Sequence, residues 1–169
     1  MTRWQALIAV CLANALALAG CPRGDAASPR TGAPRAARPD AKSTAVERDV
    51  LELVNRHRRA RRLPPLAADA RIAAEARRHS AAMAAGRGLG HAGFDDRVAA
   101  LRRLMPVRQS AENVAFNRGH RDPAAEAVRG WLASRGHRRN IEGPYELTGV
   151  GVATNAKGEV YFTQLFVGR

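Results

Sequence analysis

Three short segments in the second half of the chain carry side chains that could act together chemically. The segment GLGHAGF contains His91, SAENVAF contains Glu112, and WLASRGHRRNI contains His137. Two imidazoles and one carboxylate, each beside a glycine or a chain turn, could converge on one pocket. The three residues are far apart along the chain, so their spacing alone does not show that they meet.

No recognisable catalytic nucleophile accompanies these three groups. The sequence contains neither G-x-S-x-G nor H-E-x-x-H. Ser134 lies three residues before His137 and could in principle be activated by it. Such activation needs a third orienting group and an oxyanion hole, and the sequence shows neither.

Apolar periodicity and capping residues predict four helical stretches. The first contains residues 46–57 and ends before Pro64, and the second is capped by Asp69 and ends at Gly86. A shorter stretch runs over residues 94–104. The fourth begins at Asp122-Pro123 and ends at Gly136, which places His137 just past the helix end.

Two alternating segments near the end of the chain predict a β-hairpin. They cover residues 148–154 and 160–168, and Asn-Ala-Lys-Gly at 155–158 forms the loop between them. Glu112 falls at the expected start of a further strand. Helices before and between a few antiparallel strands favour an α+β layered domain.

The first 20 residues are typical of a secretory signal. Arg3 gives a positive start, and the apolar stretch 6–18 is too short to span a bilayer. Leu18-Ala19-Gly20-Cys21 resembles a bacterial lipobox, which predicts cleavage before Cys21 and acylation of its sulfur. The alternative is ordinary cleavage after Ala19, with Cys21 incidental.

Composition then divides the rest of the chain into a tether and a domain. Residues 21–44 are rich in Pro, Ala and Arg and are predicted to be a disordered tether, with the folded domain over 45–169. A chain that begins at Cys21 has lost Cys11 and keeps one cysteine, so it cannot form an internal disulfide. Its core alone must stabilise the domain.

The net charge of +13 leaves several interpretations open. The basic residues are 26 Arg and only 2 Lys, densest over 56–62, in a chain rich in Ala. An excess of Arg over Lys is typical of proteins from a GC-rich genome, so the arginines do not by themselves indicate a binding partner. The first interpretation is that they form a solvated surface. Contact with anionic lipid or an envelope polymer is the functional alternative. We expect no nucleic-acid partner, since an exported protein rarely meets its own cell's nucleic acid.

The three segments, with residues 53–84 before them and the two strands after, resemble the signature of the CAP superfamily, or SCP domain. The resemblance covers roughly residues 45–169 and is closest to the short bacterial branch. It implies a three-layer α-β-α sandwich with a small antiparallel sheet. In this family two histidines and two acidic residues line a central cleft, and several members bind a divalent metal there.

Transferred residue by residue, the resemblance places His91, Glu112 and His137 at three of the four cleft positions. The fourth falls at or near Ser134. Two imidazoles and one carboxylate suffice for a weak zinc site with an open position, and no cofactor is required. Each residue also has a structural alternative: Glu112 could brace a loop, His91 could be a partly exposed loop residue, and His137 could tie the helix to the sheet.

The sequence therefore predicts a lipid-anchored envelope protein, located at the outer membrane if the cell is Gram-negative. Its domain is expected to bind a lipid or an anionic envelope ligand without turnover. The alternative is a metal-dependent hydrolase acting on peptide or envelope polymer, with Glu112 as general base and the histidines holding zinc. A structural or partner-docking role is the third interpretation.

Overall fold

The computed structural model describes residues 40–169, so the predicted signal peptide and Cys21 lie outside the described residues. The described part contains five α-helices, one π-helical turn and four strands. The helical elements are α1 (Ala41–Ala60), α2 (Ala70–Ala82), η1 (Met83–Arg87), α3 (Phe94–Arg102), α4 (Pro123–Ala133) and α5 (Arg135–Glu142). The strands are β1 (Ala67–Ala68), β2 (Gln109–Arg118), β3 (Leu147–Thr154) and β4 (Glu159–Gly168).

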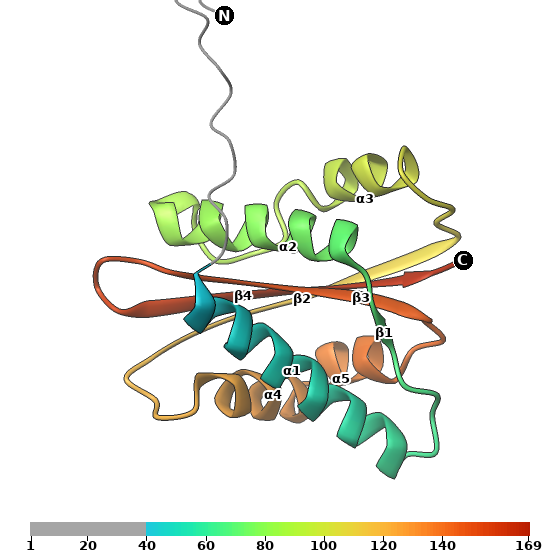
Figure 1. The fold of residues 1–169 in the computed structure, drawn as a ribbon, viewed down its shortest axis with the longest axis horizontal. Helices are drawn as coiled ribbons and strands as arrows, with labels where there is room; N and C mark the ends of the chain where they lie inside the picture. Colours follow the sequence, from blue (N-terminus) through green and yellow to red (C-terminus); the bar gives the residue numbers. More distant parts are fainter. Residues whose placement is uncertain (1–39) are drawn as a thin grey trace, which may run out of the picture. The chain divides into compact units, whose positions relative to one another are not determined.

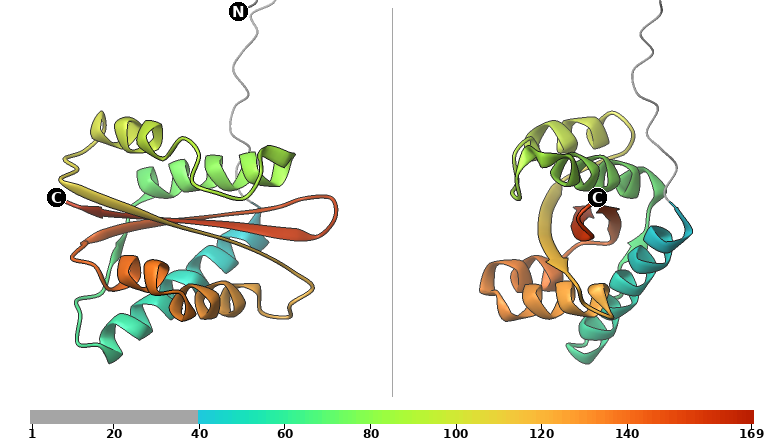
Figure 2. Two further views of the ribbon diagram at one scale, coloured as in Figure 1. Left: turned by 180° about the vertical axis from the view of Figure 1, so that it is seen from behind. Right: turned by 90° about the vertical axis from the view of Figure 1, so that its left-hand side faces the viewer.

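The helices cover both faces of one sheet (Figures 1 and 2). The helices α2 and α3 lie on one face, and α1, α4 and α5 lie on the other. The predicted α+β fold with three layers is confirmed. Within residues 40–169, no helix combines the length and the apolar character needed to cross a membrane.

The sheet has the strand order β1-β3-β4-β2, and it is mixed, not antiparallel throughout as predicted. Both β2 and β3 pair antiparallel with β4, but the two-residue β1 pairs parallel with β3, with Ala67 opposite Leu147. The chain returning from α1 runs along the β3 edge on its way to α2. There Ala67 N donates to Glu146 O at 2.8 Å, and Asp69 N donates to Thr148 O at 2.9 Å.

The first helix begins earlier than the sequence indicated. The predicted tether extended to residue 44, but residues 41–44 are helical in α1. The reason is a cap: the Asp40 carboxylate accepts a hydrogen bond from Ser43 N at 2.7 Å. This bond satisfies one of the free N–H groups of the first turn. Residues 41–44, which the sequence analysis assigned to the tether, therefore belong to the first helix.

The helix predicted to end at Gly136 breaks at Ser134 instead. Ser134 is extended, with φ −85° and ψ 123°, and it separates α4 from α5. His137 thus lies in the first turn of α5, so the prediction that it follows a helix end was wrong. Gly136 looked like a helix stop because of its residue type, but it does not adopt a positive φ.

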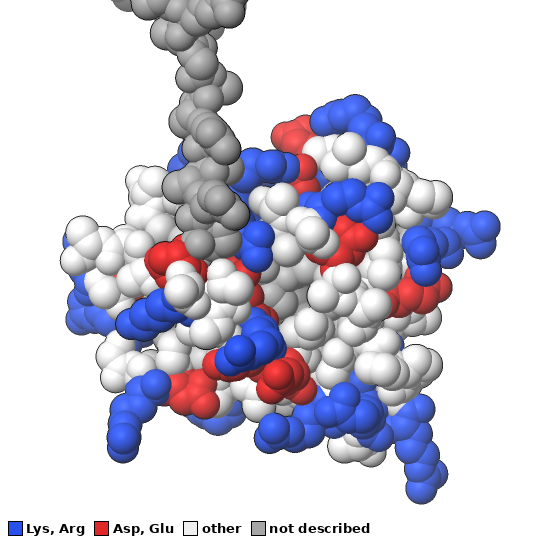
Figure 3. Space-filling model, in the orientation of Figure 1, with Lys and Arg blue, Asp and Glu red and all other residues white. Residues whose placement is uncertain are grey.

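The densest basic run is partly structural. Arg58, in the middle of this run, is fully buried, and its guanidinium donates to Pro64 O, Ile141 O and Gly143 O at 2.7, 2.7 and 2.9 Å. It thereby ties the end of α1 to the chain that follows α5. On the face drawn in Figure 3, basic side chains project mainly from the periphery, with acidic side chains between them.

Candidate functional site

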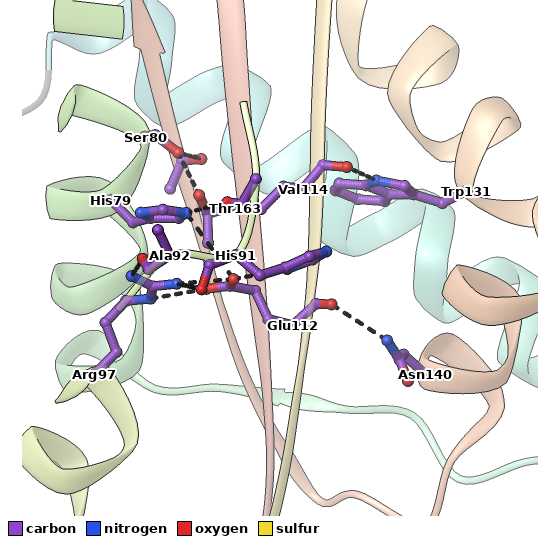
Figure 4. A network of polar contacts seen from close by, with 12 residues as sticks. His79, Ser80, His91, Ala92, Arg97, Glu112, Val114, Trp131, Asn140 and Thr163 are labelled. Carbon is purple, nitrogen blue, oxygen red and sulfur yellow. Dashed lines mark hydrogen bonds and ion pairs between the residues drawn. The ribbon is translucent and has the colours of Figure 1, made fainter. Parts of the chain in front are cut away.

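Two of the predicted site residues, Glu112 and His91, meet at β2, the strand at one edge of the sheet (Figure 4). Glu112 is in β2, His91 is in the loop between η1 and α3, and His137 is in α5 on the other face. The ring centroids of His91 and His137 are 6.5 Å apart. The structure therefore brings together two imidazoles and one carboxylate that are distant along the chain.

The Glu112 carboxylate is buried and bonded through both oxygens. Its Oε1 accepts from His91 Nδ1 at 3.0 Å and from Arg97 Nη2 at 2.8 Å, while its Oε2 accepts from Arg97 Nε at 2.8 Å. Only 2% of the Glu112 side chain is exposed, against 52% for His91. A buried carboxylate needs such partners because an unpaired charge is costly away from water. His91 therefore contacts the buried carboxylate through Nδ1 while about half of its side chain is exposed.

A tight loop sets the position of His91. Gly93 has φ +74°, a left-handed conformation that glycine adopts without strain, and it starts α3 directly after the loop. Phe94 N donates to His91 O at 3.0 Å, and Arg97 Nη1 donates to Ala92 O at 2.9 Å. Arg97 thus holds both the loop that carries His91 and the carboxylate that His91 contacts.

A buried histidine of α2 holds the same loop. His79 Nε2 lies 2.8 Å from Gly90 O, next to His91 in the chain, and 3.9 Å from Glu112 Oε1. Burial lowers the pKa of His79 below its usual value, so the neutral imidazole is favoured. His79 is therefore buried in α2 and bonded to the backbone of the loop, which is a structural role.

Asparagine and tryptophan side chains fix the β2 edge on the opposite face. Asn140 Nδ2 donates to Glu112 O at 3.2 Å and to Asn113 Oδ1 at 2.9 Å. Asn113 Nδ2 in turn donates to His137 O at 3.1 Å, and Trp131 Nε1 donates to Val114 O at 2.9 Å. These bonds tie α4 and α5 to the strand, so His137 also has the scaffold role that the sequence left open.

Ser134 lies on the His137 side of this site. Together with His137 it lines a hollow of about 290 Å³ between β2 and α4, which Trp131 and Phe116 also line. The Ser134 side chain makes no capping hydrogen bond to α5. Burial and then the charge of nearby His91 lower the pKa of His137, so its imidazole is neutral near pH 7.

The donor set does not fit a divalent metal as it stands. Within residues 40–169, no three His, Cys, Asp or Glu side chains are placed to share an ion. Two imidazoles on one tetrahedral zinc, with Zn–N bonds of about 2.0–2.1 Å, would bring their ring centroids to about 5 Å. The observed 6.5 Å is longer, and Glu112 directs both oxygens at Arg97. The observed arrangement does not support the predicted weak zinc site, and metal binding remains a prediction for experiment.

Sequence reasoning missed Arg97 and the partners of Asn140. Arg97 sits among many arginines and six positions after His91, so its residue type gave no signal. The one available sign was its place in the first turns of the expected helix beginning at Phe94, directly after the His91 loop. Asn140 lies three residues after His137, and its contacts to β2 depend on how α5 packs against the sheet.

The layered fold is that of a CAP-type domain. The model of the CAP family, described as the cysteine-rich secretory protein family, matches residues 51–166. The chain belongs to this family. No curated protein sequence matches it.

Solved structures of bacterial proteins share the fold. An extracellular protein of Bacillus anthracis with an SCP domain is 29% identical, with a TM-score of 0.63, and the match covers 75% of this chain and 41% of that one. An outer surface protein of Borrelia burgdorferi is 15% identical, with a TM-score of 0.66 and coverage of 75% and 95%. A cysteine-rich secretory protein of Staphylococcus aureus is 17% identical, with a TM-score of 0.63 and coverage of 78% and 41%. The chain thus spans about two fifths of the Bacillus and Staphylococcus proteins.

Proposed function

We propose that this protein is an exported CAP-domain protein of the cell envelope that binds an anionic, single-chain lipid without turnover. One observation carries the proposal: an apolar groove with a basic rim lies between α1 and α4. Its volume is about 460 Å³. The following residues line it: Leu53, Arg56, His57, Ala60, Ala125, Val128, Arg129 and Leu132.

The groove combines the two features that an amphipathic lipid needs. Leu53, Ala125, Val128 and Leu132 offer an apolar surface for an acyl chain, and ligand sites of this kind are mostly apolar with few polar groups. Arg56 stands at the same groove and can pair with a carboxylate or phosphate headgroup, whereas Arg129 is bonded to Glu126 and would have to exchange that partner for the headgroup. We therefore propose this groove as the site where the anionic lipid binds.

The geometry at Glu112 supports binding over hydrolysis. A general base must be free to take a proton from a water or substrate within hydrogen-bond reach. Both oxygens of Glu112 are held by Arg97 and His91, and only 2% of its side chain is exposed. The hydrolase interpretation thus requires Arg97 to release the carboxylate first, and no contact of the site favours such a step.

An envelope location is supported by the signal-like sequence and by the solved relatives. The Bacillus relative is described as extracellular and the Borrelia relative as an outer surface protein. We further propose that Cys21 is acylated and anchors the domain, since several acyl chains give stable membrane attachment. Under this proposal, Cys21→Ala moves the protein from the detergent phase to the aqueous phase on detergent partitioning.

The lipid proposal is tested by filling the groove. A fluorescent fatty acid is titrated into the full chain and into the variant Ala125→Trp. Ala125 lines the groove and is half-buried, so the indole should occupy the space of the acyl chain. We expect binding to weaken by at least about tenfold.

The matched control is Ala133→Trp, on the exposed last turn of the same helix and outside the groove lining. It should bind the fatty acid as the wild type does. Equal affinity of wild type and Ala125→Trp, with both proteins folded by circular dichroism, would show that the groove is not the lipid site.

A further inference from the structure

The site around Glu112 already contains a positive charge, which the side chain of Arg97 supplies. Arg97 meets Glu112 through Nε at 2.8 Å and Nη2 at 2.8 Å, one donor on each carboxylate oxygen. The two side chains are only 11% and 2% exposed. This paired geometry matches the fork of a guanidinium to the two oxygens of a carboxylate, which is the strongest form of this ion pair.

Arg97 is also fixed in place by the His91 loop. Its Nη1 donates to Ala92 O at 2.9 Å, its Nη2 approaches His91 O at 3.4 Å, and its backbone N donates to Gly93 O at 3.1 Å. The guanidinium cannot leave Glu112 without breaking contacts to the loop as well. It also has no accessible neutral form in a protein. The positive charge beside Glu112 is therefore permanent.

We infer that Arg97 is the resident cation of this site and that it competes with divalent metals for Glu112. A metal bound to Glu112 would replace at least one Arg97 bond and would lie within a few ångströms of a like charge. His91 would also have to turn Nδ1 away from Glu112 Oε1. Arg97 is thus a specificity-determining residue: it keeps the two imidazoles and the carboxylate from acting as a strong metal site.

The inference predicts a gain of function on removing the arginine. Co²⁺ is titrated into the full chain and into Arg97→Met, and binding is followed by visible absorption and by calorimetry. Methionine keeps a long apolar side chain but removes the charge and the donors. We expect Arg97→Met to bind Co²⁺ at least about tenfold more tightly than wild type, a change of the size that other residues contacting metal ligands produce.

The double variant Arg97→Met/Glu112→Gln is the control for binding elsewhere, since it leaves every other histidine and both cysteines unchanged. The gain should vanish in it. A gain that persists in the double variant, or no gain in a folded Arg97→Met, would overturn the inference.

Arg97→Lys keeps the inference testable if Arg97→Met does not fold. Lysine keeps the charge but is a point donor that cannot bind both carboxylate oxygens in a fork. We expect an intermediate gain in Co²⁺ affinity, and wild-type affinity in folded Arg97→Lys would count against the inference. None of these changes touches the groove between α1 and α4, so fatty acid binding should stay at the wild-type level in each variant.

Discussion

The two faces of the sheet are built in different ways. The face covered by α1, α4 and α5 is filled by large side chains, among them Trp131, Phe162, Phe166 and Ile141. The face covered by α2 has little room. A side chain at Gly149 or Gly151 would overlap backbone atoms of α2, so the helix lies directly on β3.

A set of buried polar groups lies on the face of the sheet that α2 covers. Under α2, Ser80 Oγ bonds to Gly151 O and to Thr163 Oγ1, each at 2.9 Å, and the buried His79 and Glu112 lie on the same side. Such groups need fixed partners, because a buried polar group without a hydrogen bond is costly. Close backbone packing supplies that fixed geometry. The face covered by α1, α4 and α5, here called the aromatic face, holds the larger cluster of buried apolar side chains, and the α2 face holds the side-chain contacts of Glu112.

The largest expected effect comes from the aromatic face. Trp131 is fully buried, and its Nε1 donates to Val114 O. Trp131→Ala should lower the free energy of unfolding by about 3–5 kcal/mol, measured by urea denaturation of the full chain. Trp131→Phe keeps most of the ring but leaves Val114 O without its donor, and should cost about 1–3 kcal/mol. A Trp131→Ala protein as stable as wild type would mean that this face does not carry the apolar core.

On the α2 face, adding a side chain should lower the free energy of unfolding. On the aromatic face, removing a side chain should lower it. Gly151→Ala places a methyl group against the backbone of Ala76 and Arg77, which cannot move aside as a side chain can. We expect a loss of about 3 kcal/mol, the upper part of the usual range for overpacking.

Gly130→Ala is the matched control for this change. Gly130 is an exposed residue of α4, and a side chain there meets nothing within 4 Å. Alanine should stabilise that helix by about 0.5–1 kcal/mol. Equal and small effects at the two glycines would contradict the close approach of α2 to β3.

The same difference explains what could be predicted from sequence. Helix periodicity and caps at Asp69 and Asp122 identified α1 to α4, because these signals are local, but they did not separate α5 from α4. The parallel pairing of β1 could not be predicted from two alanines, since it depends on where the chain from α1 meets β3. The convergence of His91, Glu112 and His137 came from the family resemblance. Arg97 escaped prediction because its role depends on a contact fifteen residues away, across two elements.

The smallest expected effect is a pH dependence of the free energy of unfolding, caused by His79 and His137 at the candidate site. Burial lowers the pKa of His79 and of His137 in the folded protein. In the unfolded chain both imidazoles have the usual pKa of about 6.5. Below that pH the unfolded state binds protons that the folded state does not, so stability falls with falling pH. Each histidine contributes at most about 1.4 kcal/mol per pH unit.

Urea denaturation at pH values from about 7.5 to 5 measures this dependence, because the window spans the unfolded histidine pKa of about 6.5 and lies above the pKa values of most carboxylates. The variant His79→Gln can still donate to Gly90 O but does not titrate, so its stability should fall less steeply with acid than that of wild type. His120→Gln is the control, since the His120 side chain is 46% exposed, and it should keep the wild-type slope. A wild-type stability that is flat over this window, or a slope unchanged in His79→Gln, would show that protonation of the buried His79 is not what couples the site to the fold.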